Sequence, residues 1–361
     1  MLDSFFGHLW GDGALMRAVS DRAFAKARSH LHMPALAGLN EQLVAQADAA
    51  GLVPRWHGFR VVAGDASVLE QAIRQCRRTR GLAGANQRLF ALYLPGPELT
   101  LHAAVHSGCQ SERAMPAEAL DKLGPHDVLV LDRGYPAAWL INLLNARGIR
   151  FVMRCDTTGG GWKAVRAFMR GGQDEATVTL SRPDAQDAAD WGCANSAPTV
   201  RLVCNLATGA KLRVLLTNLS AHEVPAAAFG ELCHQRWRIE EAYKRLKHRL
   251  HLEAVSGLSQ HALLIDVAAK VLADNITALM CIAAQPIASP SGLARQCQRK
   301  HAAHAVRQVL SRILLNLGNA LALFADALNV IGRCLHRITP GRSAPRAPDR
   351  VKPHARLAYK G

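Results

Sequence analysis

Three acidic residues lie where their carboxylates could act together in one site. Asp65 closes the β-branched run FRVVAGD, Asp132 closes the apolar run DVLVLD, and Glu240 lies in the segment HQRWRIEEAYKRLKHRL. Carboxylate oxygens are the ligands that Mg²⁺ and Mn²⁺ prefer in proteins. Two such ions can align a water molecule or a 3′-hydroxyl group opposite a phosphodiester and stabilise the leaving oxygen. The sequence therefore suggests a two-metal site, provided that the fold brings the three side chains together.

Each of these acids also has an ordinary structural explanation when it is considered alone. Asp65 could belong to a turn, Asp132 could cap the end of a strand, and Glu240 could be the ion-pair partner of Arg236 one helical turn away. The three acids together, in this order and on these types of element, favour the catalytic interpretation. We therefore predict that Asp65, Asp132 and Glu240 are catalytic residues and metal ligands.

The segment around Glu240 is strongly basic, and helical spacing separates its two adjacent acids. At 3.6 residues per turn, one stripe of the helix carries Arg236, Glu240, Tyr243 and Lys247, whereas Glu241 points about 100° away. Glu240 rather than Glu241 is therefore predicted to belong to the site. Bound metal ions would make it tolerable to hold an acid beside a polyanion, and the surrounding cations would bind that polyanion.

Apolar runs on either side of these acids predict a mixed α/β sheet. Their β-branched and apolar residues predict strands at 59–65, 88–94, 98–105, 127–132 and 150–155. Pro136 and Gly148 bound a segment of helical period between the last two strands. Asp65 and Asp132 are predicted at the carboxyl ends of their strands, where functional residues collect in open α/β sheets.

The charge of the chain indicates the kind of partner that it binds. The 361 residues carry a formal net charge of +16, with an isoelectric point near 10.0. Hydrophobic residues make up 49% of the sequence, which is enough for a substantial core. So strong a positive charge favours nucleic acid or an anionic membrane surface. Since no isolated basic amphipathic helix stands out, we predict a nucleic-acid partner and no membrane.

The sequence predicts a protein of a reducing compartment. The opening residues MLDSFFGHLWGDG lack the basic segment and apolar run of a secretory signal. The most apolar late stretches are interrupted by Asp, Asn or Lys, so we expect buried helices rather than membrane spans. The nine cysteines show no zinc-ligand spacing, so we expect free thiols in a cytoplasmic protein.

The character of the sequence changes several times along the chain. The stretch at 156–220 is rich in Gly, Asp and Ala and holds short strand candidates. The stretch at 258–336 shows helical patterns throughout. We predict a helical DNA-binding region at 1–55, the first part of a core at 56–155, an inserted β-rich subdomain at 156–220, a segment at 221–257 that completes the core with the Glu240 helix, a helical region at 258–336 and a basic tail at 337–361.

The segment HQRWRIEEAYKRLKHRL resembles the signature helix of DDE transposases of the large bacterial insertion-sequence-four family. That signature is Tyr, two residues, Arg, three residues, Glu, six residues, Lys. Arg236, Glu240 and Lys247 match its last three positions, and Cys233 stands where the family has Tyr. LDRGY resembles the second-Asp motif of the family and GDASVL its first-Asp strand. SERA, FVMR and SDRAFAKAR resemble further landmarks, so the resemblance extends from about residue 20 to about residue 260.

The resemblance implies an RNase H-like catalytic domain with a β-rich insertion between the second Asp and the Glu. It implies that the three acids bind two Mg²⁺ or Mn²⁺ ions, and that the protein cuts DNA and joins 3′-ends to a target. The expected partners are the terminal inverted repeats, target DNA and a second copy of the chain in a synaptic dimer, in the nucleoid of a bacterial cytoplasm. The residues expected to contact DNA are Arg133, Tyr135, Arg154, Arg236, Arg238, Tyr243, Lys244 and Lys247.

Two other functions stay open from the sequence. An RNase H-like nuclease would cut DNA without joining it, and its reaction products would distinguish it from a transposase. A catalytically inactive relative would only bind DNA, and Cys233 in place of Tyr is the feature that supports this alternative.

Overall fold

The chain forms two compact units. The computed structural model describes residues 6–7, 9, 19–69, 87–157, 161–206, 212–236, 238–254, 259–284, 295–315 and 317–337. The sheet unit runs over Glu41–Glu70 and Gly84–Arg245, and the helical unit combines residues up to Asn40 with residues from Leu246 onward. Almost all of the predicted basic tail lies outside the described residues. The boundaries of the six predicted parts remain predictions.

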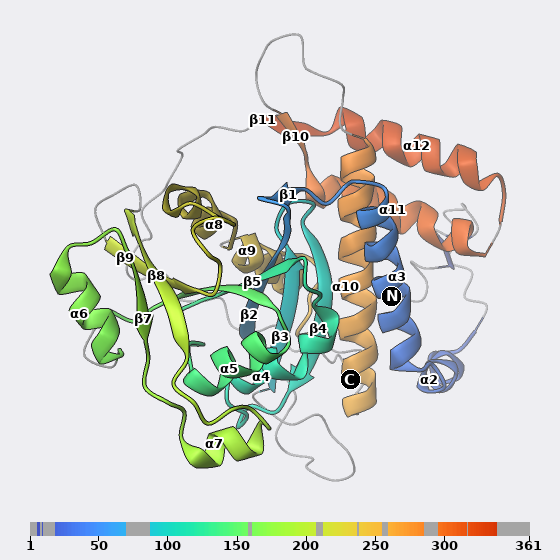
Figure 1. Ribbon diagram of the computed structural model, residues 1–361. Helices are drawn as coiled ribbons and strands as arrows, with labels where there is room; N and C mark the ends of the chain where they lie inside the picture. The colour runs from blue at the N-terminus through green and yellow to red at the C-terminus, as the bar shows by residue number, and fades with distance from the viewer. Residues whose placement is uncertain are drawn as a thin grey trace, which may run out of the picture. The chain divides into compact units, whose positions relative to one another are not determined.

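The sheet unit is built on a mixed sheet that has nine strands among the described residues (Figure 1). The strands are β1 (Arg55–Trp56), β2 (Phe59–Leu69), β3 (Gln87–Leu94), β4 (Leu99–His106), β5 (Asp127–Leu131), β6 (Arg150–Arg154), β7 (Glu175–Thr179), β8 (Thr199–Leu206) and β9 (Leu212–Thr217). Their order is β4-β3-β2-β5-β6-β9-β8-β7, and β1 pairs with β2.

The first five long strands have the order and directions of an RNase H-like fold. β2, β3 and β4 are antiparallel neighbours, whereas β5 pairs parallel to β2 and β6 pairs parallel to β5. The parallel strands are buried and almost wholly apolar, which is why their sequences form continuous hydrophobic runs. The predicted fold class is therefore confirmed: an α/β protein with an RNase H-like mixed sheet, a β-rich insertion and helical N- and C-terminal regions.

The strands of the insertion continue this sheet instead of forming a second one. β9 pairs antiparallel with β6, so that Arg154 lies opposite Leu215, and β8 and β7 follow in antiparallel order. The helices α6 (Lys163–Gly171) and α7 (Ala185–Asp190) connect these strands. The insertion thus adds β9, β8 and β7 to the edge of the sheet formed by β6.

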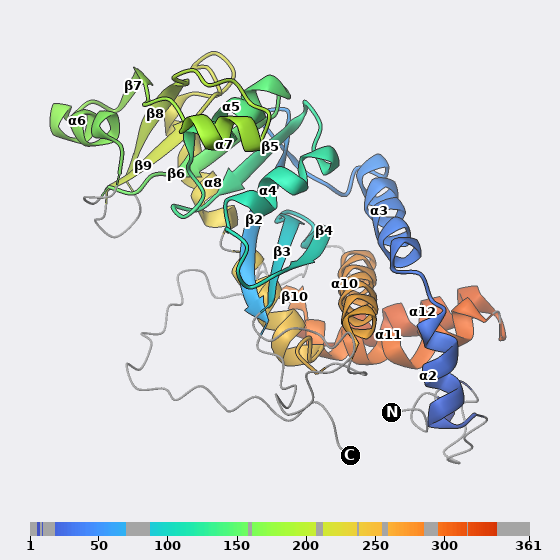
Figure 2. The same ribbon diagram turned by 90° about the horizontal axis from the view of Figure 1, so that it is seen from below.

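The helices of the sheet unit cover the two faces of the sheet. They are α4 (Ala114–Glu118), α5 (Ala138–Ala146), α6, α7, α8 (Phe229–Arg236) and α9 (Arg238–Lys244), with the short helices η1 (Leu120–Lys122) and η2 (Ala226–Ala228). Phe229 and Leu232 of α8 pack on Val130 of β5 and Val152 of β6 in one hydrophobic cluster. α5 lies on the opposite face of the sheet (Figures 1 and 2).

The helical unit packs three long helices together (Figure 2). Its elements are α2 (Asp21–Ser29), the start of α3 (Met33–Ala49), α10 (Gln260–Ala283), α11 (Arg299–Leu314), α12 (Ala320–Arg333), β10 (Arg295–Cys297) and β11 (Leu335–Arg337). Asn275 of α10 donates a buried hydrogen bond to the side chain of Asn40 at 2.6 Å. Among the described residues, no helix is long and apolar enough to span a membrane.

Candidate active site

Two of the three acids lie side by side because of the register between β2 and β5. Ala63 is opposite Val130 in this parallel pair, so Asp65 and Asp132, each two residues further along, lie at the same level and on the same face. Asp132 directly follows β5, as predicted. Asp65 does not end its strand, contrary to the prediction, because β2 continues to Leu69 in its pairing with β3.

Glu240 approaches this edge on α9, and Arg236 connects it to Asp132. One nitrogen of Arg236, Nη2, lies 3.6 Å from Asp132 Oδ2 and 3.6 Å from Glu240 Oε1. Arg154 Nη1 lies 3.7 Å from the other oxygen of Asp132, Oδ1. These distances exceed the usual range for hydrogen bonds, so the guanidinium groups act as nearby charges. Asp132 therefore lies between two cations.

Asp65 is held by backbone and tyrosine groups. The Ala66 N–H donates to Asp65 Oδ1 at 2.9 Å, and the Tyr135 hydroxyl lies 3.5 Å from the same oxygen. The Tyr243 hydroxyl donates to the Asp65 carbonyl oxygen at 2.6 Å and also lies 3.2 Å from the Leu89 carbonyl oxygen. Both tyrosines are buried, and burial raises the pKa of each phenol. Each phenol thus stays a neutral hydrogen-bond donor beside Asp65.

The pKa of Asp65 is raised, mainly by burial and in part by the other two acids. Burial raises this pKa to about 6, while the Ala66 N–H and the Arg236 guanidinium lower it. The charges of Asp132 and Glu240 also contribute to this rise, less than burial does. Since a like charge within a few ångströms disfavours ionisation, the three carboxylates influence one another electrostatically.

The three carboxylates are ligands of the type that a divalent cation prefers. Their oxygens do not converge on one point in this structure. Asp132 Oδ1 is buried, and no donor among the described residues hydrogen bonds to it. Across the described part of the chain, no three acidic, His or Cys side chains are close enough together to hold a metal ion. Arg236 lies between Asp132 and Glu240 and supplies the positive charge there.

The remaining residues predicted to contact DNA occupy several environments. Arg133 is exposed in the turn after Asp132, and Arg238 is exposed and donates to the Pro95 carbonyl oxygen at 2.8 Å. Lys244 is exposed on α9 and pairs with Glu241. Tyr135 and Tyr243 are 2% and 6% exposed, so in this structure they contact Asp65 rather than solvent.

The predicted helical stripe is present from Arg236 to Glu240 and does not continue to Lys247 with α-helical spacing. Arg236 and Glu240 form the expected pair, whereas Glu241 belongs to another face with Lys244. From Arg245 to Arg249 the backbone is π-helical, so the α-helical spacing that predicted the position of Lys247 does not hold there. Lys247 belongs to the helical unit, where it pairs with Glu253 at 3.4 Å. The side chain of Cys233 lies outside the described residues.

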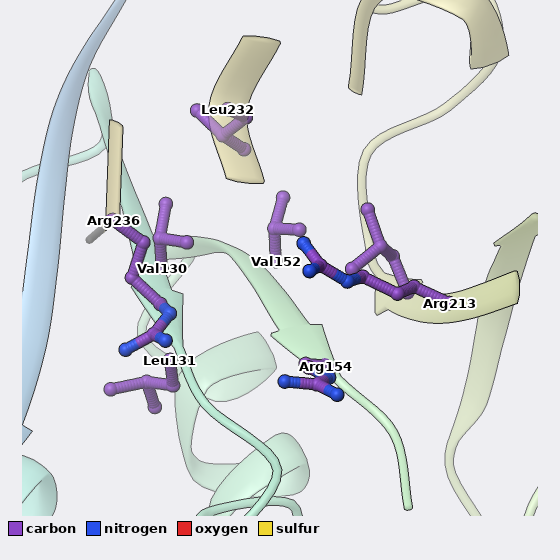
Figure 3. A pocket seen from close by; sticks show the side chains of 8 residues that line it. Val130, Leu131, Val152, Arg154, Arg213, Leu232 and Arg236 are labelled. Carbon is purple, nitrogen blue, oxygen red and sulfur yellow. The ribbon is translucent and has the colours of Figure 1, made fainter. Parts of the chain in front are cut away.

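A third arginine beside the site was not predicted from the sequence. A pocket of about 20 Å³ is lined by Val130, Leu131, Val152, Arg154, Arg213, Leu215, Leu232 and Arg236 (Figure 3). Arg213 comes from β9, two residues before Leu215 on the same face of that strand. The alternation within LRVLLT places these two residues together, but it does not reveal that β9 pairs with β6.

The chain belongs to the Transposase DDE domain family. The model of this family matches residues 60–276, which is more than half of the chain and includes all three acids. No curated protein matches the sequence.

One solved structure similar to this chain is a piggyBac transposase synaptic complex with hairpin DNA, determined by cryo-EM. Its sequence is 11% identical and its TM-score is 0.41, with 79% of this chain and 59% of that chain covered. The chain thus spans less than two thirds of the length of that transposase.

Proposed function

We propose that this chain is the transposase of an insertion sequence of the insertion-sequence-four type. It binds the terminal inverted repeats, cuts phosphodiesters and joins the 3′-hydroxyl ends to target DNA. One observation carries the proposal: Asp65 and Asp132 lie level on adjacent strands of an RNase H-like sheet, and both lie near Glu240. Membership of the DDE family supports it.

The three acids are the proposed ligands for two Mg²⁺ or Mn²⁺ ions. When bound, such ions lower the barrier to attack by a hydroxyl group and stabilise the leaving oxygen. Asp65 is fixed for this role by the Ala66 N–H, while Tyr135 and Tyr243 hold its side chain and its backbone. The two tyrosines are therefore proposed as positioning residues, although the sequence predicted them as DNA contacts.

Arg236 and Arg154 are proposed to balance the acids until substrate arrives. Both guanidinium groups lie within 4 Å of Asp132 without a close hydrogen bond to it. Arg154 is partly exposed, whereas Arg236 is buried. A DNA phosphate offers a guanidinium a stronger, bidentate partner. Pairing with DNA would then leave the carboxylates to the metal ions. Arg133, Arg238, Lys244 and Lys247 are proposed as further DNA contacts.

The partners follow from the same proposal. DNA at the element ends and at the target supplies the polyanion that the net charge of +16 favours. The chain is proposed to act as a homodimer in a synaptic complex with DNA. We propose that the protein acts on DNA in the bacterial cytoplasm.

A cleavage and strand-transfer assay tests the function. The substrate is the pair of inverted repeats that flank the coding region, incubated with the full chain and Mg²⁺. Glu240→Gln, Asp65→Asn and Asp132→Asn should each abolish cutting and joining while DNA binding persists. Glu241→Gln is the matched control, since it removes the adjacent exposed acid, and it should retain activity.

The products separate the proposal from its alternatives. Joined products support a transposase, and cutting without joining would identify a nuclease. DNA binding without cutting would identify an inactive relative. If Glu240→Gln cut and joined as well as the parent, the assignment of the three acids would be wrong.

A further inference from the structure

Three arginines line one small pocket at the edge of the candidate site. Arg154 ends β6, Arg213 lies on β9 and Arg236 ends α8, so each comes from a different element (Figure 3). Arg213 extends from β9 toward Val152 in this view.

Strand register explains why Arg154 and Arg213 lie on one face of the sheet. Val152 lies opposite Val130 in the β5–β6 pair, and Arg154 lies opposite Leu215 in the β6–β9 pair. Side chains two residues apart on a strand share a face, so Arg154 lies on the face of Val152 and Arg213 on the face of Leu215. This is the face that α8 covers and on which Asp132 lies.

Arg213 differs from the other two pocket arginines in its ion pairing. Asp132 and Glu240 compensate Arg236, and Asp132 also compensates Arg154. The charge of Arg236 also acts on Asp65. Within the described ranges, no carboxylate forms an ion pair with Arg213. Gathering like charges raises the energy of the folded protein, and an apolar floor strengthens their repulsion. An arrangement that does not stabilise the fold is typical of a site for an anion.

The size and chemistry of the pocket define that anion. A volume of about 20 Å³ admits a group of the size of one water molecule or one oxygen atom, and it excludes a nucleobase. Guanidinium groups match the oxygens of phosphate through pairs of parallel N–H donors.

We infer that Arg213, together with Arg154 and Arg236, binds one phosphate group of the DNA substrate. The inference rests on the proposed function and adds a residue of the insertion to the DNA-binding site. Arg213 contributes a guanidinium group with which no carboxylate in the described part of the chain forms an ion pair. The phosphate is either an internal phosphodiester or a terminal 5′-phosphate, since both present the same oxygens.

Salt-dependent DNA binding tests this inference on the full-length chain. The probe is a fluorescent 20-base-pair duplex, with and without a 5′-phosphate, titrated at several salt concentrations. Arg213→Ala should weaken binding by about tenfold and reduce the salt slope by about one, which is the expected loss of one phosphate contact. Arg213→Lys should keep the slope but bind several-fold more weakly than the parent, because it lacks the paired donors.

Arg182→Ala is the matched control, since it removes one exposed arginine from the same insertion outside the pocket. It should leave the slope near that of the parent. Thermal unfolding accompanies each variant: Arg213→Ala should melt no lower than the parent, whereas a lower melting temperature would indicate a structural role and overturn the inference.

The two forms of the duplex identify the phosphate. A defect in Arg213→Ala confined to the phosphorylated duplex supports a terminal phosphate, and an equal defect on both supports an internal phosphodiester. Unchanged binding by Arg213→Ala beside normal binding by the parent would overturn the inference and leave the proposed function intact. If the parent failed to bind DNA, both would fail.

Discussion

Asp65 shows how local structure prepares one carboxylate for a positively charged partner. Burial and the charges of Asp132 and Glu240 disfavour its ionised form, and its pKa rises to about 6. The Ala66 N–H and Arg236 offset only part of this effect. A bound cation would compensate the buried negative charge. It would therefore stabilise the ionised form of Asp65 in the folded protein.

Asp65→Asn should therefore stabilise the metal-free protein at neutral pH. The folded pKa of about 6 lies above the ordinary value of 3.8, so the unfolded carboxyl ionises first as pH rises. The parent thus loses stability between about pH 4 and pH 6, whereas the neutral Asn does not. The variant should be more stable by about 1–2 kcal/mol at pH 7.5 and equal to the parent near pH 4. Urea unfolding in EDTA across this range measures the difference.

Glu241→Gln controls for the loss of a negative charge, because Glu241 is exposed and pairs with Lys244. Its stability should follow that of the parent. A stability difference of the same size at every pH for Asp65→Asn would instead mean that the amide changes packing, and the electrostatic explanation would be wrong.

At the scale of elements, the register of β2 against β5 decides whether the acids meet. Arg60 and Asp127 are opposite each other in this pair, at the start of the apolar runs. Arg60 Nε lies 2.6 Å from Asp127 Oδ1 and Nη2 lies 2.8 Å from Oδ2, and the Gly124 N–H donates to Oδ2 at 2.8 Å. Asp127 is 2% exposed. A slip of one residue would turn Asp65 to the other face, and this bidentate pair opposes such a slip.

Asp127→Ala should destabilise the protein by about 3–5 kcal/mol, because it leaves the Arg60 guanidinium partly buried, with Asp48 as its one remaining acidic partner among the described residues. Denaturant unfolding measures the loss. Glu41→Gln removes an ion pair with Lys122 that is much more exposed, and it should cost less than about 1 kcal/mol. Equal losses in the two variants would contradict a special role for the β2–β5 ion pair.

Local sequence patterns predicted the elements of the catalytic domain well because each strand carries its own signal. The apolar run before Asp132 and the β-branched run before Asp65 are visible without knowledge of their neighbours. Pairing between distant segments has no such signal, so the junction of β9 with β6 could not be predicted. The π-helical turn beginning at Arg245 was missed for a related reason, since it departs from the regular spacing on which the position of Lys247 depended.

Across the whole molecule, most of the excess positive charge lies outside the candidate site. The three acids and the pocket arginines nearly compensate one another, yet the chain carries a net charge of +16. Exposed cations such as Arg133 lie outside these pairs, together with many others along the chain. Charges of this kind attract a long polyanion over many contacts and speed its association, whereas the pocket fixes a single phosphate.

DNA binding by the full chain should consequently fall steeply with salt. Each neutralised phosphate releases counterions, so six or more contacts would reduce affinity by about 10³-fold or more between 50 mM and 200 mM salt. Fluorescence anisotropy with a mixed-sequence duplex measures the slope. Because counterion release depends on the phosphates and not on the acids, Glu240→Gln should give a slope close to that of the parent. An affinity that barely changed over this range would mean that the net charge does not contact the DNA backbone.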